Sequence, residues 1–339
     1  MKKLLVFMLL VALALLALFF FLRGRPQRFA RDGAATALFA LVPADAQAVL
    51  YFDAAALRQS ALWGELAVRL PSPKQDREYE EFVKATGFDY TRDLDRGLCI
   101  QRGANPRMLV AAEGRFDRDR VLRYWRQRGR AEKQAGQDVY ILTSLPGTPP
   151  MAAAFANSAG GAPRILLGEG GDLSDALAMN AFPPASGNGR QAWRDRLARA
   201  AGARIFVVAR VDALRKVLPL AGVRVDGAGD ILKKLDWLIL TASFEPDSLR
   251  IGLEGEATGI AAALQISALL EGLRMMGRGS LHDPDTAKQT HPLERALLTA
   301  ILDSGRISLD GRHVQVRFQL PRDLLFRLTD SQNTPARQR

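Results

Sequence analysis

The sequence is nearly devoid of cysteine and histidine. Cys99 is the single cysteine among 339 residues, which excludes an intramolecular disulfide and any paired C-x-x-C motif. The three histidines do not form an H-E-x-x-H pattern. A phosphate-binding G-x-x-x-x-G-K-[ST] loop and a G-x-S-x-G nucleophile elbow are also missing. We therefore expect no catalytic residue, no cofactor and no metal site, and the sequence does not predict an enzyme.

Two groups of residues could nevertheless carry chemistry. Cys99 lies in a predicted apolar strand, where a small buried side chain is a better interpretation than a nucleophile. His282, Asp283, Asp285 and His291 share one polar loop, and imidazole and carboxylate groups can bind a divalent metal. Loops collect these residue types for turn formation alone, and no predicted helix or strand fixes these four. We therefore expect this loop to hold no metal.

Long apolar runs are also scarce, apart from one at the N-terminus. Residues 4–22 are apolar without interruption, between Lys2 and Lys3 on one side and Arg23 and Arg25 on the other. Nineteen helical residues span about 28 Å, close to the hydrocarbon thickness of a bilayer. A cleaved signal peptide is the alternative, but no small-x-small cleavage site lies at a suitable distance from the run. We expect a single-pass inner-membrane anchor over 1–22, with the folded part in the periplasm.

Basic residues outnumber acidic ones, with a formal charge of +11. The densest basic stretch, residues 115–133, contains Tyr124 and Trp125 and could in principle bind nucleic acid through phosphate contacts and base stacking. The alternative is a surface helix in which Val121, Leu122 and Trp125 form the buried stripe. We favour the helix and expect no nucleic-acid partner.

The rest of the chain alternates between short strands and helices. A tether over 23–43 leads to a first module over 44–145 and a connecting segment over 146–202, which contains two short strands and two helices. A second module follows over 203–321, then a C-terminal helix and tail over 322–339. Within the second module, a helix over 258–276 has an apolar stripe that includes Ile266, Leu269, Leu273 and Met276.

The two modules resemble each other. Placing Leu94-Asp95 on Leu235-Asp236 also superposes Glu113-Gly114 on Glu254-Gly255 without a gap. Each module reads as strand–helix–hairpin–helix–hairpin. The predicted fold class is therefore α+β: two copies of this module, with mostly antiparallel sheet, preceded by one transmembrane helix.

Three segments, "LVPADAQAVLYFDAAALRQSALW", "FVKATGFDYTRDLDR" and "AAEGRFD", resemble a family of bacterial envelope proteins. Members of this family carry an N-terminal signal or anchor and a repeated domain of unknown function that begins at a P-A-D-A motif. The resemblance covers about residues 41–320 and implies a location and a fold, but no site residues.

Two functions remain open. The first is a non-enzymatic, membrane-tethered binding or scaffold protein of the bacterial cell envelope, with an envelope protein as its partner. The alternative is a carrier or sensor of an apolar ligand held between helices and sheet, which a closed cavity lined by the stripe of the 258–276 helix would favour.

Overall fold

A computed structural model describes residues 37–69, 77–103, 107–134, 136–142, 150–157, 163–181, 188–217, 228–282 and 291–333. The predicted anchor over 1–22 and most of the polar loop between His282 and His291 lie outside the described residues. The chain forms two compact units. Among the described residues, the N-terminal unit comprises those in 37–59 and 77–205, and the C-terminal unit comprises those in 60–69 and 206–333.

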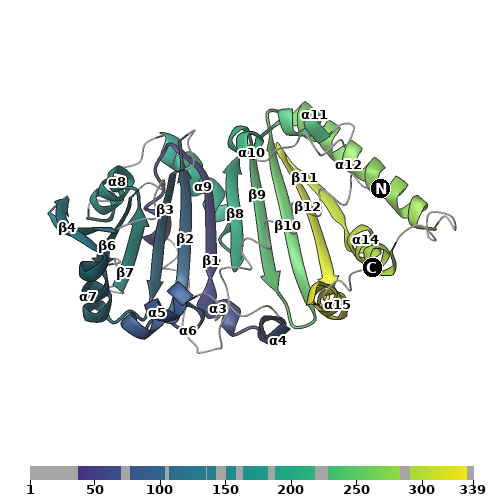
Figure 1. The fold of residues 1–339 in the computed structure, drawn as a ribbon. Helices are drawn as coiled ribbons and strands as arrows, with labels where there is room; N and C mark the ends of the chain where they lie inside the picture. The colour runs from purple at the N-terminus through teal and green to yellow at the C-terminus, as the bar shows by residue number, and fades with distance from the viewer. Residues whose placement is uncertain are drawn as a thin grey trace. The chain divides into compact units, whose positions relative to one another are not determined.

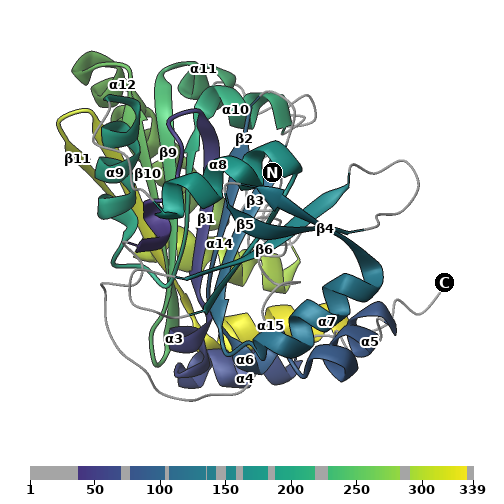
Figure 2. The same ribbon diagram turned by 90° about the vertical axis from the view of Figure 1, so that its left-hand side faces the viewer.

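The N-terminal unit begins with a strand that leads directly into a short helix. Its described elements are β1 (Ala46–Asp53), α3 (Ala54–Arg58), α5 (Arg77–Thr86), α6 (Tyr90–Asp93), β2 (Leu94–Arg102), β3 (Arg107–Gly114), α7 (Arg118–Arg128), β4 (Gly129–Gln134), β5 (Gln137–Leu142), β6 (Met151–Asn157), β7 (Pro163–Gly168), α8 (Gly170–Ala181) and α9 (Asn188–Ala200). Figures 1 and 2 show α5 beside α7 in this unit.

The C-terminal unit takes one helix from the early part of the chain and the rest from its second half. Its described elements are α4 (Ala61–Arg69), β8 (Ile205–Arg210), α10 (Val211–Val217), α11 (Ala228–Lys233), β9 (Leu235–Phe244), β10 (Ser248–Ala257), α12 (Ile260–His282), α14 (Pro292–Ser304), β11 (Arg306–Asp310), β12 (His313–Pro321) and α15 (Arg322–Asn333). The boundary between the two units falls after Ile205, the first residue of β8. Helix α12 contacts α14, β10, β11 and β12 (Figure 1).

The predicted duplication is wrong, because the strand order differs between the two halves. Among the described residues, the strand order is β11-β12-β10-β9-β8 in the C-terminal unit and β1-β2-β3-β7-β6-β5-β4 in the N-terminal unit. In the C-terminal unit β12 pairs directly with β10, with Val316 opposite Leu253. In the N-terminal unit β3 pairs instead with β7, with Leu166 opposite Ala111, and β5 pairs with β6. Strands β6 and β7, which belong to the predicted connecting segment, therefore lie between β3 and β5, which the duplication would have paired with each other.

The burial pattern of β9 also differs from expectation, since the sequence predicts that Leu98, Ile100, Leu238 and Leu240 are all buried. Leu98 and Ile100 of β2 are buried as expected. In β9 the buried side chains are Trp237 and Ile239, whereas Leu238 and Leu240 are half-buried. Placing Leu94 on Leu235 aligns Leu98 with Ile239, and both are buried. Leu238 and Leu240 lie on the opposite face of β9, because side chains alternate between the two faces of a strand.

Local signals in the sequence place several helix ends correctly. Asp53 ends β1 and caps α3, where its Oδ1 accepts a hydrogen bond of 2.8 Å from the Ala56 backbone N–H. Asp117 caps α7 in the same way, through a bond of 3.0 Å from the Arg120 N–H. Gly87 follows α5 with φ +73°, a left-handed conformation that glycine adopts without steric cost. Side-chain capping thus sets the start of both helices.

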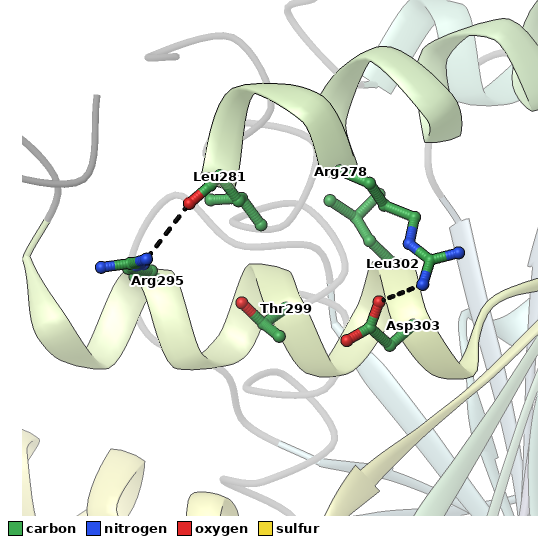
Figure 3. Close-up of a pocket in the computed structure, with 6 residues that line it drawn as sticks. All are labelled: Arg278, Leu281, Arg295, Thr299, Leu302 and Asp303. Atoms are coloured by element: carbon green, nitrogen blue, oxygen red, sulfur yellow. Dashed lines mark hydrogen bonds and ion pairs between the residues drawn. The ribbon is translucent and has the colours of Figure 1, made fainter. Parts of the chain in front are cut away.

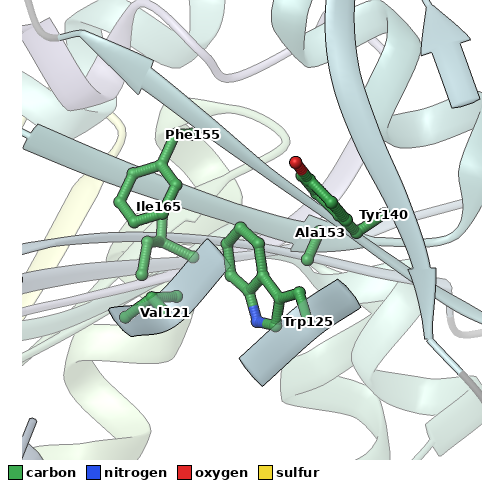
Figure 4. Packing of buried hydrophobic residues seen from close by; sticks show 6 residues of the cluster. All are labelled: Val121, Trp125, Tyr140, Ala153, Phe155 and Ile165. Atoms are coloured by element: carbon green, nitrogen blue, oxygen red, sulfur yellow. The ribbon is translucent and has the colours of Figure 1, made fainter. Parts of the chain in front are cut away.

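The core of the N-terminal unit contains a cluster of aromatic side chains beneath α7. Val121 and Trp125 of α7 are 0% and 4% exposed and pack against Tyr140, Phe155 and Ile165 (Figure 4). The Trp125 and Phe155 ring centroids are 5.1 Å apart, in a tilted arrangement. Aromatic pairs at this distance contribute about 0.5–1.5 kcal/mol beyond the area they bury. Trp125 therefore holds the helix onto the sheet and is not exposed for base stacking.

Candidate functional site

The outer face of α12 is the most distinctive surface of the C-terminal unit. The sequence is rich in Ala and Leu from Ile260 onward, so helix propensity is high over the whole segment. On the inner side, Ala263 and Ile266 are 0% and 3% exposed and pack against Ala257 and Val314. The side of α12 that faces the sheet is therefore covered by residues of its own unit.

The opposite side of α12 is also apolar, and it is exposed. Six large apolar side chains on it are at least one-third exposed: Ile260 62%, Leu264 54%, Leu269 41%, Leu273 36%, Met275 64% and Met276 62%. Ala261, Ala268 and Gly272 lie between them. At 100° per residue, these nine positions, together named the outer face of α12, cover somewhat more than half of the helix circumference. Burying the six large side chains would contribute on the order of 5–10 kcal/mol.

This exposure corrects the orientation expected from the sequence. Ile266 lies on the buried side as predicted, but Leu269, Leu273 and Met276 point into solvent. Since α12 is apolar on nearly all sides, its periodicity could not identify the side that packs on the sheet. In the described part of the chain, Ile260–Leu281 is the helix that has the length and hydropathy to cross a bilayer, and only 11% of its most apolar 18-residue stretch is buried.

Charged groups beside the outer face are paired with other protein groups. Arg274 Nε lies 2.9 Å from Glu271 Oε2, and Arg278 Nη2 lies 2.9 Å from Asp303 Oδ1. Lys234 Nζ donates a hydrogen bond of 2.8 Å to Gln265 Oε1. The two arginines beside the apolar surface are therefore paired with carboxylates, and they do not form a strongly basic rim around it.

A small pocket lies on the side of α12 that faces α14. It has a volume of about 140 Å³ and is lined by Arg278, Leu281, Arg295, Thr299, Leu302 and Asp303 (Figure 3). Arg295 donates a hydrogen bond of 3.2 Å to the Leu281 carbonyl at one end of the pocket. Pockets for small ligands usually measure about 300–1,000 Å³ and are mainly apolar. This pocket is too small and too charged to match the apolar-ligand site that the sequence left open.

Cys99 lies in β2, and burial raises the pKa of its thiol to about 11. A thiol with this pKa is protonated at neutral pH, and only the thiolate is nucleophilic. We predict that Cys99 in the native chain does not react with a maleimide at pH 7.5 over minutes, whereas it reacts fully in guanidinium chloride. The measurement is the mass shift on labelling. Rapid native labelling would contradict the inert assignment.

Among the histidines, His291 and His313 make contacts within the protein. His291 caps α14, where its Nδ1 accepts a hydrogen bond of 3.3 Å from the Leu293 N–H. His313 Nδ1 lies 3.0 Å from Glu254 Oε1. In the ranges that the structure describes, no group of three or more His, Cys, Asp or Glu residues could hold a metal ion. Asp283 and Asp285 lie outside these ranges, and so does the His282 side chain.

The buried carboxylates of the N-terminal unit are each paired with arginine. Glu113 Oε1 accepts a bond of 2.6 Å from Arg164 Nη2, and both side chains are at most 3% exposed. Arg102 Nη1 lies 2.7 Å from Asp172 Oδ1 and 2.9 Å from Asp175 Oδ2. A general base needs a free acceptor that faces a substrate. The geometry of these clusters instead indicates a structural role.

A further cluster surrounds Asp93 at the start of β2. Partial burial alone would raise the pKa of Asp93, but hydrogen bonds from Arg92 and from the Asp89 backbone N–H outweigh this effect and lower it. Arg115 Nη2 lies 3.4 Å from Asp93 Oδ1 and contributes in the same direction. Asp93 is therefore an ionised structural group that joins α6 to Arg115, the residue after β3.

Three arginines of α7, Arg118, Arg120 and Arg128, also make contacts within the protein. Arg128 lies 4.9 Å from the centre of the Tyr124 ring and 3.2 Å from a Glu81 carboxylate oxygen. Arg118 lies over the Phe155 ring at 5.5 Å. The basic stretch that could have indicated phosphate binding is thus a helix with its own aromatic and acidic partners.

No family model and no curated protein matches the chain. Among solved structures, it is similar to three crystal forms of TP0453. Form IV is 11% identical, with a TM-score of 0.45 over 89% of this chain and 100% of that one. Form III is 10% identical, with a TM-score of 0.44 over 89% and 99%. Form I is 9% identical, with a TM-score of 0.40 over 86% and 96%.

Proposed function

We propose that this chain is a non-enzymatic, membrane-tethered binding or scaffold protein of the bacterial cell envelope. The single observation that carries the proposal is the outer face of α12, where six large apolar side chains are exposed along one helix. Contiguous exposed apolar surface on a folded protein marks a binding or membrane-contact site. An envelope protein partner belongs to the same proposal.

The apolar run over 4–22 supports the tether. Its length matches the bilayer, and basic residues flank both ends. A short N-terminal tail of this kind usually remains in the cytoplasm while the chain behind it is exported, so we place the folded part in the periplasm. The likeness of residues 41–320 to the envelope family with a P-A-D-A motif favours the same location.

The buried carboxylates contact arginines of the same protein, and this supports a non-enzymatic role. The clusters around Glu113 and Arg102 consist of arginine–carboxylate pairs, and Cys99 is buried. A carrier or sensor of an apolar ligand is the less favoured function, because the pocket between α12 and α14 is small and lined partly by charged groups. The scaffold role accounts for the exposed helix without requiring an interior site.

The tether predicts that the full chain remains with membranes after a carbonate wash and retains residues 1–22. A reporter that is active only in the periplasm, fused after Arg339, should be active. N-terminal sequencing, fractionation and the reporter assay check the three statements separately. A mature N-terminus near Ala37, or a soluble product, would contradict the anchor, and activity of a cytoplasmic reporter would contradict the orientation.

A further inference from the structure

We propose that the outer face of α12 lies in the surface of a lipid bilayer, with its apolar side chains among the upper acyl chains. This inference rests on the proposed tether and adds the occupant of the exposed helix. An interfacial helix lies in the membrane plane with one apolar face immersed by about 5–10 Å. The other side of α12 remains packed on its own protein unit.

The composition of the face favours lipid over a protein partner. The nine positions that form the outer face of α12 are Ile, Leu, Met, Ala and Gly, and the polar residues Gln265, Glu271 and Arg278 lie on the same side of the helix. Protein interfaces concentrate their binding energy in Trp, Tyr and Arg side chains, and of these only Arg278, near the C-terminal end of α12, lies on this side. A mainly aliphatic surface matches hydrocarbon, which offers no directional partner.

The charged residues of α12 determine how deeply it can enter. Glu271, Arg274 and Arg278 lie within the same stretch, and charged side chains at the bilayer centre are costly. Arg274 and Arg278 are already paired with carboxylates at 2.9 Å. These ion pairs keep α12 at the surface, and they leave little unpaired positive charge to attract anionic headgroups.

The proposed tether keeps the folded part near the bilayer that α12 would contact. Fourteen residues, 23–36, separate the end of the apolar run from the first described residue, Ala37. At full extension they span about 50 Å at most, so residues 4–22 hold the folded part close to one bilayer. An apolar helix that binds lipid weakly on its own then meets the membrane at a high effective concentration.

The experiment uses the full-length chain in vesicles of phosphatidylcholine, with or without phosphatidylglycerol. Cys99→Ala removes the native thiol, and a bimane label is attached at Leu264→Cys or Met276→Cys. The matched control is Val68→Cys on α4, an apolar position in the same unit that is 75% exposed. Unchanged circular dichroism confirms that each variant is folded.

The expected result is quenching of the labels at 264 and 276 by lipids brominated near the headgroup end of the acyl chain. Quenching should be roughly twofold weaker with bromine near the methyl end, because an interfacial helix is shallow. Both vesicle compositions should give the same result, and aqueous iodide should quench only the label at 68. Met276→Glu combined with the label at 264 should reduce the quenching by lipid.

Each other outcome overturns the inference. Iodide quenching of the α12 labels in a chain that still floats with the vesicles would leave the tether intact but exclude lipid contact. Shielding from both quenchers would assign the face to a protein occupant, either residues 4–22 or a second copy. Stronger quenching near the methyl end would indicate a spanning helix. Failure to float would overturn the tether and the inference together.

Discussion

Replacement of Arg164 by alanine is expected to lower the free energy of unfolding by about 3–5 kcal/mol, because it leaves a buried carboxylate without its closest partner. Arg164 is 1% exposed and donates to Glu113 Oε1 from Nη2 at 2.6 Å and from Nε at 3.2 Å. The remaining neighbour, Arg96, lies 3.4 Å from Glu113 Oε2 and cannot satisfy both oxygens. Guanidinium unfolding of the detergent-solubilised chain, followed by tryptophan fluorescence, measures the loss.

The control for Arg164 is an arginine pair on the surface. Arg130→Ala breaks the contact between Arg130 and Glu132 at 2.8 Å, in which the arginine side chain is 77% exposed. Exposed pairs contribute about 0–1 kcal/mol, so this variant should be nearly as stable as the wild type. The combination Glu113→Leu with Arg164→Met should recover part of the lost stability. If Arg164→Ala and Arg130→Ala lowered the free energy of unfolding equally, burial of the pair between Glu113 and Arg164 would not contribute to stability.

Trp125→Ala is expected to destabilise the N-terminal unit by about 3–5 kcal/mol, the usual cost of removing a large aromatic side chain from a packed core. Trp125 is 4% exposed and contacts both Tyr140 and Phe155, so the cavity would lie between α7 and the sheet. The measurement is the shift in the guanidinium midpoint followed by circular dichroism.

Arg123→Ala, on an exposed side of α7, serves as the matched control and should change stability by less than about 0.5 kcal/mol. Trp125→Phe should recover part of the loss, because it restores an aromatic side chain at the same position. A Trp125→Ala variant as stable as Arg123→Ala would mean that α7 does not depend on this cluster.

The sequence predicted those parts of the fold that depend on nearby residues. The pair Asp310-Gly311 is typical of a hairpin turn, and the structure has this turn, with Gly311 at φ +57°. The strands at Met151–Asn157 and Pro163–Gly168 were also predicted. Their position between β3 and β5 was not, since strand neighbours far apart in the chain leave no local signal.

One helix boundary also escaped prediction. The composition of residues 54–70, rich in Ala and Leu and followed by Pro71, predicts a single helix, but the structure has α3 and α4, which are separated at Gln59 and Ser60. Ser60 Oγ accepts a hydrogen bond of 3.3 Å from the Trp63 N–H, as serine does at a helix start. The division between the two units falls at the same point, so tertiary packing prevailed over the high helix propensity of this segment.

The apolar helix could be located from the sequence, but the side of it that is exposed could not be predicted. The apolar composition of the segment after Gly259 was evident, yet the buried side was assigned to Leu269, Leu273 and Met276. A helix that is apolar all round gives no periodic contrast, so only the contacts of α12 with β10, β11, β12 and α14 reveal which side is free.

The inclusion of α4 in the C-terminal unit has a consequence for biosynthesis. Glu65 of α4 pairs with Arg322 at 2.6 Å, a contact that joins residues 257 positions apart. At about 5–20 residues per second, the ribosome needs roughly 13–50 s to deliver that partner. During this time Leu62, Trp63 and Leu66, which are buried in the finished unit, remain without their cover. These apolar side chains therefore stay exposed on the nascent chain until both Phe244 of β9 and helix α15 have emerged, and truncation before α15 removes the contact between Glu65 and Arg322.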